Sequence, residues 1–119
     1  MARFLLVLRP VENQTPAALL DAIQPLLDAL QAEVDHRTPA HLSALLKGAA
    51  EPQRMQLFAD VQSKAEGPVL EVVLLSREAM GTGAPHTRLT FEQVVALSTR
   101  HMPGCEVVFR SDRDGALPA

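Results

Sequence analysis

The chain has 119 residues, of which 47% are hydrophobic, so it can bury the core of a single domain and is not wholly disordered. Its net charge of −3 and its lack of Trp and Tyr argue against nucleic-acid binding, which favours basic surfaces and aromatic stacking. The single cysteine, Cys105, excludes an internal disulfide and a multi-cysteine metal site, and we expect it to act as a small buried hydrophobe.

The first predicted element is a strand over residues 3–9, which stops at Pro10. It contains the uninterrupted apolar run of residues 4–8, and a similar run occupies residues 69–75. Near-continuous apolar runs are typical of strands that are covered on both faces. We therefore expect the two segments to lie side by side as central strands of one sheet.

A helix is predicted to begin at Thr15-Pro16, where an N-cap residue precedes a proline in the first turn. Its apolar positions recur at helical spacing and form one stripe: Leu19, Leu20, Ile23, Leu26, Leu27 and Leu30. Pro25 should kink this helix or start a new one. Residues 32–37 are either the frayed helix end or a short edge strand, and we favour the strand.

Two short helices are expected next. Thr38-Pro39 begins the first, which has Leu42, Leu45 and Leu46 on its inner face and ends near Gly48. Glu51-Pro52 begins the second, which ends at Gly67-Pro68 and has an apolar face made by Met55, Phe58 and Val61.

After the strand at residues 69–75, a loop precedes another helix. Thr90 and Gln93 form a capping-box pattern that predicts the start of this helix, and Pro103-Gly104 ends it. Residues 105–110 then alternate in polarity and predict a last strand at or near an edge of the sheet.

This order predicts an α+β domain over residues 1–111 with a flexible tail over residues 112–119. We expect a ferredoxin-like βαββαβ split sheet with extra helices inserted before the third strand. An alternative omits the strand at residues 32–37 and leaves three strands with right-handed crossovers. One face of a ferredoxin-like sheet is often open, so the apolar central strands require a second cover. A second copy of the chain is the simplest cover, which predicts a homodimer or higher assembly.

The best candidate site is a loop rich in glycine and threonine, residues 81–88, which precedes a helix whose first amides could bind an anion. It lacks the Gly-Lys-Ser/Thr ending of a Walker loop and the third glycine of a dinucleotide fingerprint. The end of the first strand offers further polar groups. The candidate anion-binding residues are Arg9, Asn13, Gly81, Gly83, His86, Arg88 and Thr90. The alternative is a flexible loop without a ligand.

The other histidines do not suggest a metal site or a catalytic group. His36 and His41 are five residues apart, whereas a zinc-binding helical pair requires four, so solvated side chains are favoured. His101 falls in the last turn of a predicted helix, where a cation is favourable. We expect no metal, no cofactor and no catalytic residue.

Short motifs are similar to those of nucleoside diphosphate kinases: Arg9-Pro10 after the first strand, Gly67-Pro68-Val69 at the second apolar strand, and Ala79-Met80-Gly81 after it. The resemblance implies a ferredoxin-like fold and a degenerate anion site. Phe109 stands where that family has its catalytic histidine, so phosphotransfer through a phosphohistidine is not implied.

The opening residues 4–10 also resemble the YCII-like small dimeric proteins, a ferredoxin-like family that pairs a helix histidine with an aspartate late in the chain. His41 could match that histidine. His101-Met102-Pro103 stands where an Asp-Pro would be expected.

Together these patterns predict a non-catalytic module that acts by self-association and binds a partner or a small anion, without nucleic-acid or membrane partners. The alternative is a small or degenerate enzyme for a phosphorylated or carboxylated metabolite, with Arg9 and Arg88 binding the anion and His86 as acid or base. We expect a cytoplasmic protein, because the first apolar run is too short for a signal peptide and no segment has membrane-spanning length.

Overall fold

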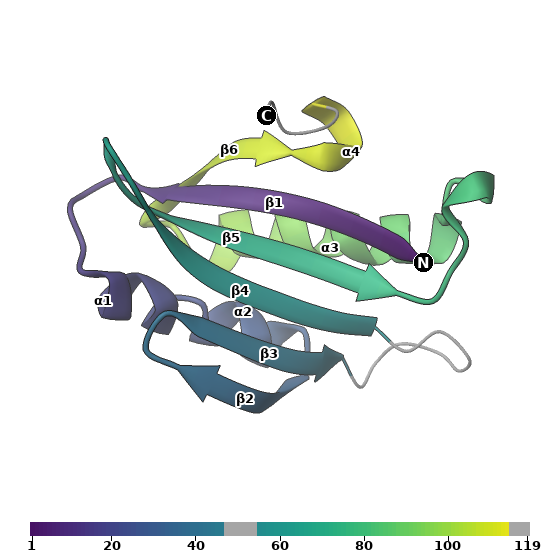
Figure 1. Ribbon diagram of the computed structural model, residues 1–119, viewed down its shortest axis with the longest axis horizontal. Helices are drawn as coiled ribbons and strands as arrows, with labels where there is room; N and C mark the ends of the chain where they lie inside the picture. The colour runs from purple at the N-terminus through teal and green to yellow at the C-terminus, as the bar shows by residue number, and fades with distance from the viewer. Residues whose placement is uncertain (47–54, 115–119) are drawn as a thin grey trace.

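The computed structural model describes residues 1–46 and 55–114. Within these ranges the chain forms a six-stranded antiparallel sheet in the order β2-β3-β4-β5-β1-β6 (Figure 1). In chain order the elements are β1 Ala2–Pro10, α1 Pro16–Asp21, α2 Gln24–Ala29, β2 Ala32–Thr38, β3 His41–Leu46, β4 Met55–Lys64, β5 Gly67–Ser76, the 3-10 turn η1 Met80–Thr82, α3 Pro85–His101, β6 Cys105–Arg110 and α4 Ser111–Asp114.

The two apolar runs lie where they were expected. They form β1 and β5, which are hydrogen-bonded neighbours inside the sheet, with Leu6 paired to Val72 and Leu8 to Leu70. The two strands are antiparallel. The expected edge strand is also present as β2, and the last strand, β6, forms the other edge.

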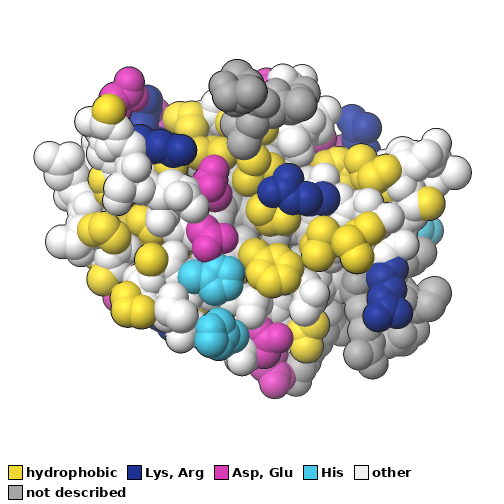
Figure 2. Space-filling view, in the orientation of Figure 1, with side chains coloured by type: hydrophobic (Ala, Val, Ile, Leu, Met, Phe, Trp, Pro, Cys, Tyr) yellow, Lys and Arg dark blue, Asp and Glu magenta, His cyan; other side chains and the backbone are white. Residues whose placement is uncertain are grey.

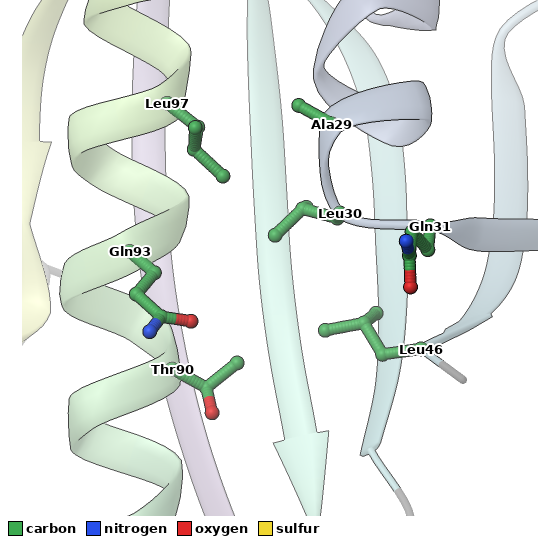
Figure 3. Close-up of a pocket in the computed structure, with 7 residues that line it drawn as sticks. All are labelled: Ala29, Leu30, Gln31, Leu46, Thr90, Gln93 and Leu97. Carbon is green, nitrogen blue, oxygen red and sulfur yellow. The ribbon is translucent and has the colours of Figure 1, made fainter. Parts of the chain in front are cut away.

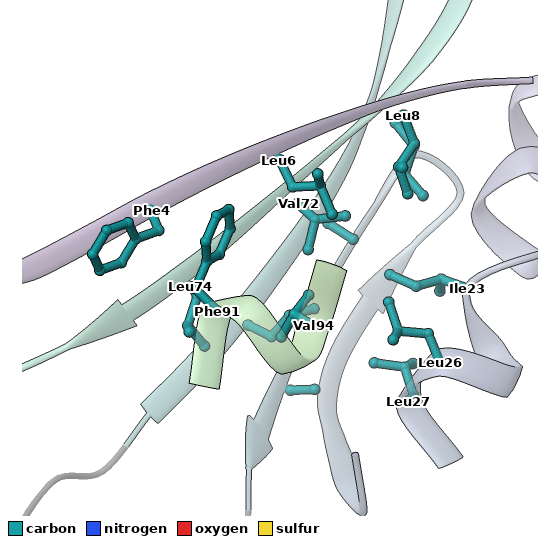
Figure 4. Close-up of a cluster of buried hydrophobic side chains, with 14 of the residues drawn as sticks. Phe4, Leu6, Leu8, Ile23, Leu26, Leu27, Val72, Leu74, Phe91 and Val94 are labelled. Carbon is teal, nitrogen blue, oxygen red and sulfur yellow. The ribbon is translucent and has the colours of Figure 1, made fainter. Parts of the chain in front are cut away.

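The main core lies between the sheet and a single layer of helices, α1, α2 and α3, which all cover the same face (Figure 1). Alternate residues of β1 and β5 point into this core, where Phe4 stacks on Phe91 of α3 with ring centroids 5.2 Å apart (Figure 4). The apolar stripe predicted for α1 and α2 is buried there as well, at Leu19, Leu20, Ile23, Leu26 and Leu27. Each such buried side chain contributes about 1.5–3 kcal/mol to stability.

Two expected helices are strands, and this is the main correction to the predicted fold. The leucines after Thr38-Pro39 lie in β3, and the apolar residues predicted after Glu51-Pro52, namely Met55, Phe58 and Val61, lie in β4. The buried positions of β4 are Met55, Leu57 and Ala59, an alternation of period two rather than a helical stripe. Thr38-Pro39, the predicted start of the first of these helices, lies at the end of β2 and in the turn to β3. Its predicted end near Gly48 and the predicted start of the second helix at Glu51-Pro52 fall in residues 47–54, which lie outside the described residues.

The first helical segment is built as predicted. The hydroxyl of Thr15 accepts a hydrogen bond from the amide of Ala18 at 3.2 Å and caps α1. The helix stops after Asp21, and α2 begins at Gln24 with Pro25 in its first turn. A proline in a first turn removes no intrahelical hydrogen bond, so the sequence breaks the segment into two helices there.

The third helix begins five residues before the predicted capping box. It starts at Pro85, and Thr90 lies inside it, with its hydroxyl donating to the carbonyl of His86 at 3.1 Å. At the other end of the chain, residues 112–114 of the expected tail belong to α4, which begins at Ser111, and Ser111 accepts a hydrogen bond from the amide of Leu5. Residues 115–119 lie outside the described residues.

The α+β class is confirmed, whereas the ferredoxin-like arrangement is not, because the strand order differs. The extra helices predicted before the third strand are replaced by β3 and β4, so β2 to β5 form a continuous antiparallel meander. The crossover through α1 and α2 carries the chain from β1 to the far edge of the sheet, and α3 connects β5 to β6 across β1.

Candidate functional site

The sheet has a second face, opposite the helix layer, which we call the open face (Figures 1 and 2). Directly paired residues of neighbouring strands arrange its side chains in rows that run across the sheet. The middle row consists of Leu5, Val73, Phe58 and Ser43. The arginine row consists of Arg3, Leu75, Gln56 and Leu45. The histidine row consists of Val7, Glu71, Asp60 and His41.

The centre of the open face is apolar. Leu5 and Val7 are only 4% and 7% exposed; α1 to α3 lie on the other side of the sheet, whereas α4 contacts their strand, β1. Phe58 and Val73 are half-buried, and Leu45 is 36% exposed. Figure 2 shows apolar side chains on this face next to a group of histidine and acidic side chains. An antiparallel sheet that faces only water normally presents polar residues on its outer face, so this face departs from that pattern.

A histidine and an aspartate are in contact on this face. Nδ1 of His41 on β3 hydrogen-bonds with Oδ1 of Asp60 on β4 at 2.6 Å, because the two residues are directly opposite in the ladder. The ring of His41 stacks on Phe58 with centroids 6.3 Å apart, and the ring of His36 lies 6.2 Å away. Since Asp60 holds Nδ1, the Nε2 atom of His41 is the one that could donate to, or accept from, a ligand.

A nearby hydroxyl is not arranged as a nucleophile. Ser43 donates its hydroxyl proton to Oδ1 of Asp35 at 2.5 Å rather than to either histidine. Asp35 lies at a register irregularity of β2 between Val34 and His36, where the bulge turns its carboxylate toward β3. A serine activated for covalent catalysis would need its hydroxyl bonded to a general base such as an imidazole, and that contact is not formed.

No group of three or more His, Cys, Asp or Glu side chains is placed to hold a metal ion in the described parts of the chain. The pair His36 and His41 lies on the two strands of one hairpin, not on a helix. The two histidines therefore lie on neighbouring strands, and the four-residue spacing of a helical zinc-binding pair does not apply to them.

The loop between β5 and α3 places one of its carboxylates, that of Glu78, at the start of α3. Glu78 accepts hydrogen bonds from the amides of His86 at 3.1 Å and Thr87 at 2.7 Å, and from the hydroxyl of Thr87 at 2.7 Å. Desolvation would raise the pKa of Glu78, but these hydrogen bonds and the nearby His86 outweigh it and lower the pKa below its ordinary value. Glu78 thus occupies the helix N-terminus where an anion was expected.

The predicted anion-binding residues separate into two groups. Arg9 lies near the end of β1, where its guanidinium group forms an ion pair with Glu106. Asn13 is exposed in the following loop. Gly81 and Gly83 lie in or beside η1, and His86, Arg88 and Thr90 lie in the first turns of α3. Because Ala2 pairs with Ser76 and Leu8 pairs with Leu70, the groups are at opposite ends of the sheet, roughly 20 Å apart.

Two cavities lie away from the His41–Asp60 pair. One, of about 170 Å³, lies between the end of α2 and α3 and is lined by Ala29, Leu30, Gln31, Leu46, Thr90, Gln93 and Leu97 (Figure 3). Another, of about 360 Å³, continues the arginine row at the end of β5 and is lined by Met1, Leu45, Gln56, Leu75, Ser76 and Arg77. Of the predicted site residues, Thr90 lines the first of these cavities.

Comparison of the chain with models of protein families and with curated proteins found no match. The resemblances to nucleoside diphosphate kinases and to YCII-like proteins therefore stay predictions. Among the described residues, the helices are all too short or too polar to cross a membrane.

Sequence reasoning missed the contact between His41 and Asp60 because both residues were assigned to short helices. The missed signal is the alternation Met55, Leu57, Ala59, which places Asp60 on the opposite face from the core. A strand reading of this segment would also have placed Phe58 and Asp60 together on one face.

Proposed function

We propose that this protein is a non-catalytic module that acts by self-association, with the open face of one copy packed on the open face of a second copy. The observation that carries the proposal is the partly exposed apolar surface of that face, formed by Phe58 and Val73 in the middle row and by Leu45 in the arginine row. Packing two such faces removes apolar surface from water at about 25 cal/mol per Å². Exposed apolar patches of this kind commonly mark protein interfaces.

The distribution of polar groups also supports a protein partner. The outer parts of the face carry charged or amide side chains, such as Arg3, Gln56 and Glu71, around an apolar centre. A polar rim around an apolar core is the usual anatomy of a specific interface. Binding of a small anion at α3 has less support, because Glu78 already accepts the hydrogen bonds of the first amides.

The test is the molar mass of the protein in solution, measured by size-exclusion chromatography with light scattering over a range of concentrations. We expect the wild-type protein to be a dimer and the Phe58→Arg and Leu45→Arg variants to be monomers. Leu89→Arg is the matched control, since Leu89 is 60% exposed on α3, in the helix layer. Circular dichroism verifies that each variant is folded. A wild-type protein that stays monomeric at the highest concentration contradicts the proposal.

A second candidate function has one specific observation in its favour. The contact of His41 with Asp60 at 2.6 Å fixes an imidazole that could act as a general acid or base on a small metabolite. The neighbouring carboxylate of Glu71 makes this part of the face unfavourable for the phosphorylated or carboxylated substrates that the sequence suggested.

Thermal shift measurements with inorganic phosphate, acetyl phosphate and citrate separate the two functions. If the enzyme alternative holds, one of these probes raises the melting temperature of the wild-type protein and has no effect on His41→Ala. His101→Ala is the control, because His101 lies at the end of α3. The proposed non-catalytic function predicts no shift that depends on His41.

A further inference from the structure

We propose that the two copies pack around a two-fold axis that runs across the strands along the middle row. This geometry rests on the proposed self-association and adds to it a defined partner surface, a second copy in one orientation. The arginine row of each copy then lies over the histidine row of the other. The argument uses the register of the strands and the charges in the rows.

The spacing of the rows allows the arginine row of one copy to lie over the histidine row of the other. Along every strand the arginine row and the histidine row each lie two residues from the middle row, for example Arg3 and Val7 on either side of Leu5. Two residues of a strand span about 7 Å, so a rotation about the middle row places one outer row over the other. Each strand then lies over the same strand of the second copy, which agrees with the aligned packing of two sheets about 10 Å apart.

The charges of the two outer rows are complementary in this arrangement. Arg3 of one copy lies over Val7 of the other copy and beside its neighbour in the same row, Glu71. The symmetry repeats this contact, so each dimer gains two ion pairs between Arg3 and Glu71. In the single chain these two residues are in different rows of the face, and no ion pair joins them among the described residues.

The polar groups around the ion pair also find partners. Gln56 of one copy lies over Asp60 of the other, which offers an amide donor to a carboxylate. Leu45 lies over His41 and covers the outer side of its ring. In the middle row Val73 and Phe58 each meet their own counterparts and form the apolar centre of the interface, beside Leu5, which is already buried within its own chain.

The other simple orientation is unfavourable. A two-fold axis along β5 would place Glu71 directly over Glu71 of the second copy and Arg3 over Gln56. Two carboxylates facing each other at a desolvated interface repel, and no cation from the described rows would lie between them. A membrane with anionic lipids is disfavoured as an occupant for the same reason, because Asp60 and Glu71 are both acidic and lie side by side.

Sedimentation equilibrium of charge-reversed variants tests the axis. In Arg3→Glu and in Glu71→Arg, both symmetric contacts become repulsive, so we expect the dissociation constant of each homodimer to rise at least tenfold. When the two variants are mixed, each contact again joins an arginine with a glutamate, so a heterodimer should form with near wild-type affinity. Arg100→Glu is the control for net charge, since it makes the same change on α3.

The outcomes distinguish the orientation from the self-association. If Arg3→Glu and Glu71→Arg dimerise like the wild-type protein, or if the mixture does not recover, the proposed axis is wrong. If Phe58→Arg is a monomer in the same experiment, self-association through the open face still stands. If Phe58→Arg also dimerises like the wild-type protein, both the axis and the proposed function fail.

Discussion

The carboxylate of Glu78 lies at the N-terminus of α3, where the sequence predicted a bound anion. The amides at the start of α3 need hydrogen-bond acceptors. The loop after β5 supplies one, a carboxylate oxygen of Glu78 that lies 2.7 Å from the amide nitrogen of Thr87. The hydroxyls of Thr87 and Ser76 are joined beneath it at 2.6 Å. The sequence indicated that these amides could bind an anion, but the loop conformation that brings Glu78 back over eight residues to His86 is a tertiary feature.

We expect Glu78→Gln to lower the melting temperature by a few degrees at pH 7. The pKa of Glu78 is lowered in the folded state from its ordinary value of 4.5, so the carboxylate stabilises the fold above about pH 4.5. This contribution is lost as the pH falls from 4.5 through the lower folded pKa, because the carboxyl group is then protonated in both states. Calorimetry should find that the difference between the two proteins shrinks toward pH 3. Glu92→Gln, on the exposed side of α3, is the control for the change of charge.

At the scale of elements, the sequence was sufficient to predict a helix or strand where its apolar residues recur with a single period. The stripe of α1 and α2 and the cap at Thr15 identified those helices correctly. Residues 41–46 and 55–64 contain apolar residues at both helical and alternating positions, so Leu42, Leu45 and Leu46 fitted a helix as well as a strand. Pairing of β4 with β5 and of β3 with β4 decides between helix and strand, and such pairing between strands cannot be derived from one local window.

The connection between α2 and β2 offers a test at this scale. Gln31 has a φ of 55°, a left-handed conformation that is unfavourable for residues other than glycine. We expect Gln31→Gly to leave the melting temperature unchanged or raise it by a few degrees. Gln93→Gly, at an exposed position inside α3, should lower stability by about 1 kcal/mol. Chemical denaturation of both variants checks this, and a loss of stability in Gln31→Gly would contradict the interpretation.

At the scale of the molecule, the sequence predicted which strands are central but not how the sheet is ordered. The apolar residues on both faces of β1 and β5 correctly indicated two adjacent inner strands. The predicted anion site failed to assemble for a geometric reason: Arg9 follows β1 and Gly81 follows β5, and antiparallel strands end at opposite edges. The histidine row arises only when β3, β4 and β5 are placed in register, so long-range pairing was required to find it.

The margins of the sheet have a consequence for how copies can aggregate. β2 is bulged between Val34 and His36, and the pairing of β6 with β1 shifts register between Val7 and Leu8. The outer strand β2 also carries the charged residues Asp35 and Arg37. Irregular, charged margins discourage the addition of one sheet after another, which would lead to open-ended fibres. Edge-to-edge growth into polymers is therefore disfavoured at both margins of the sheet.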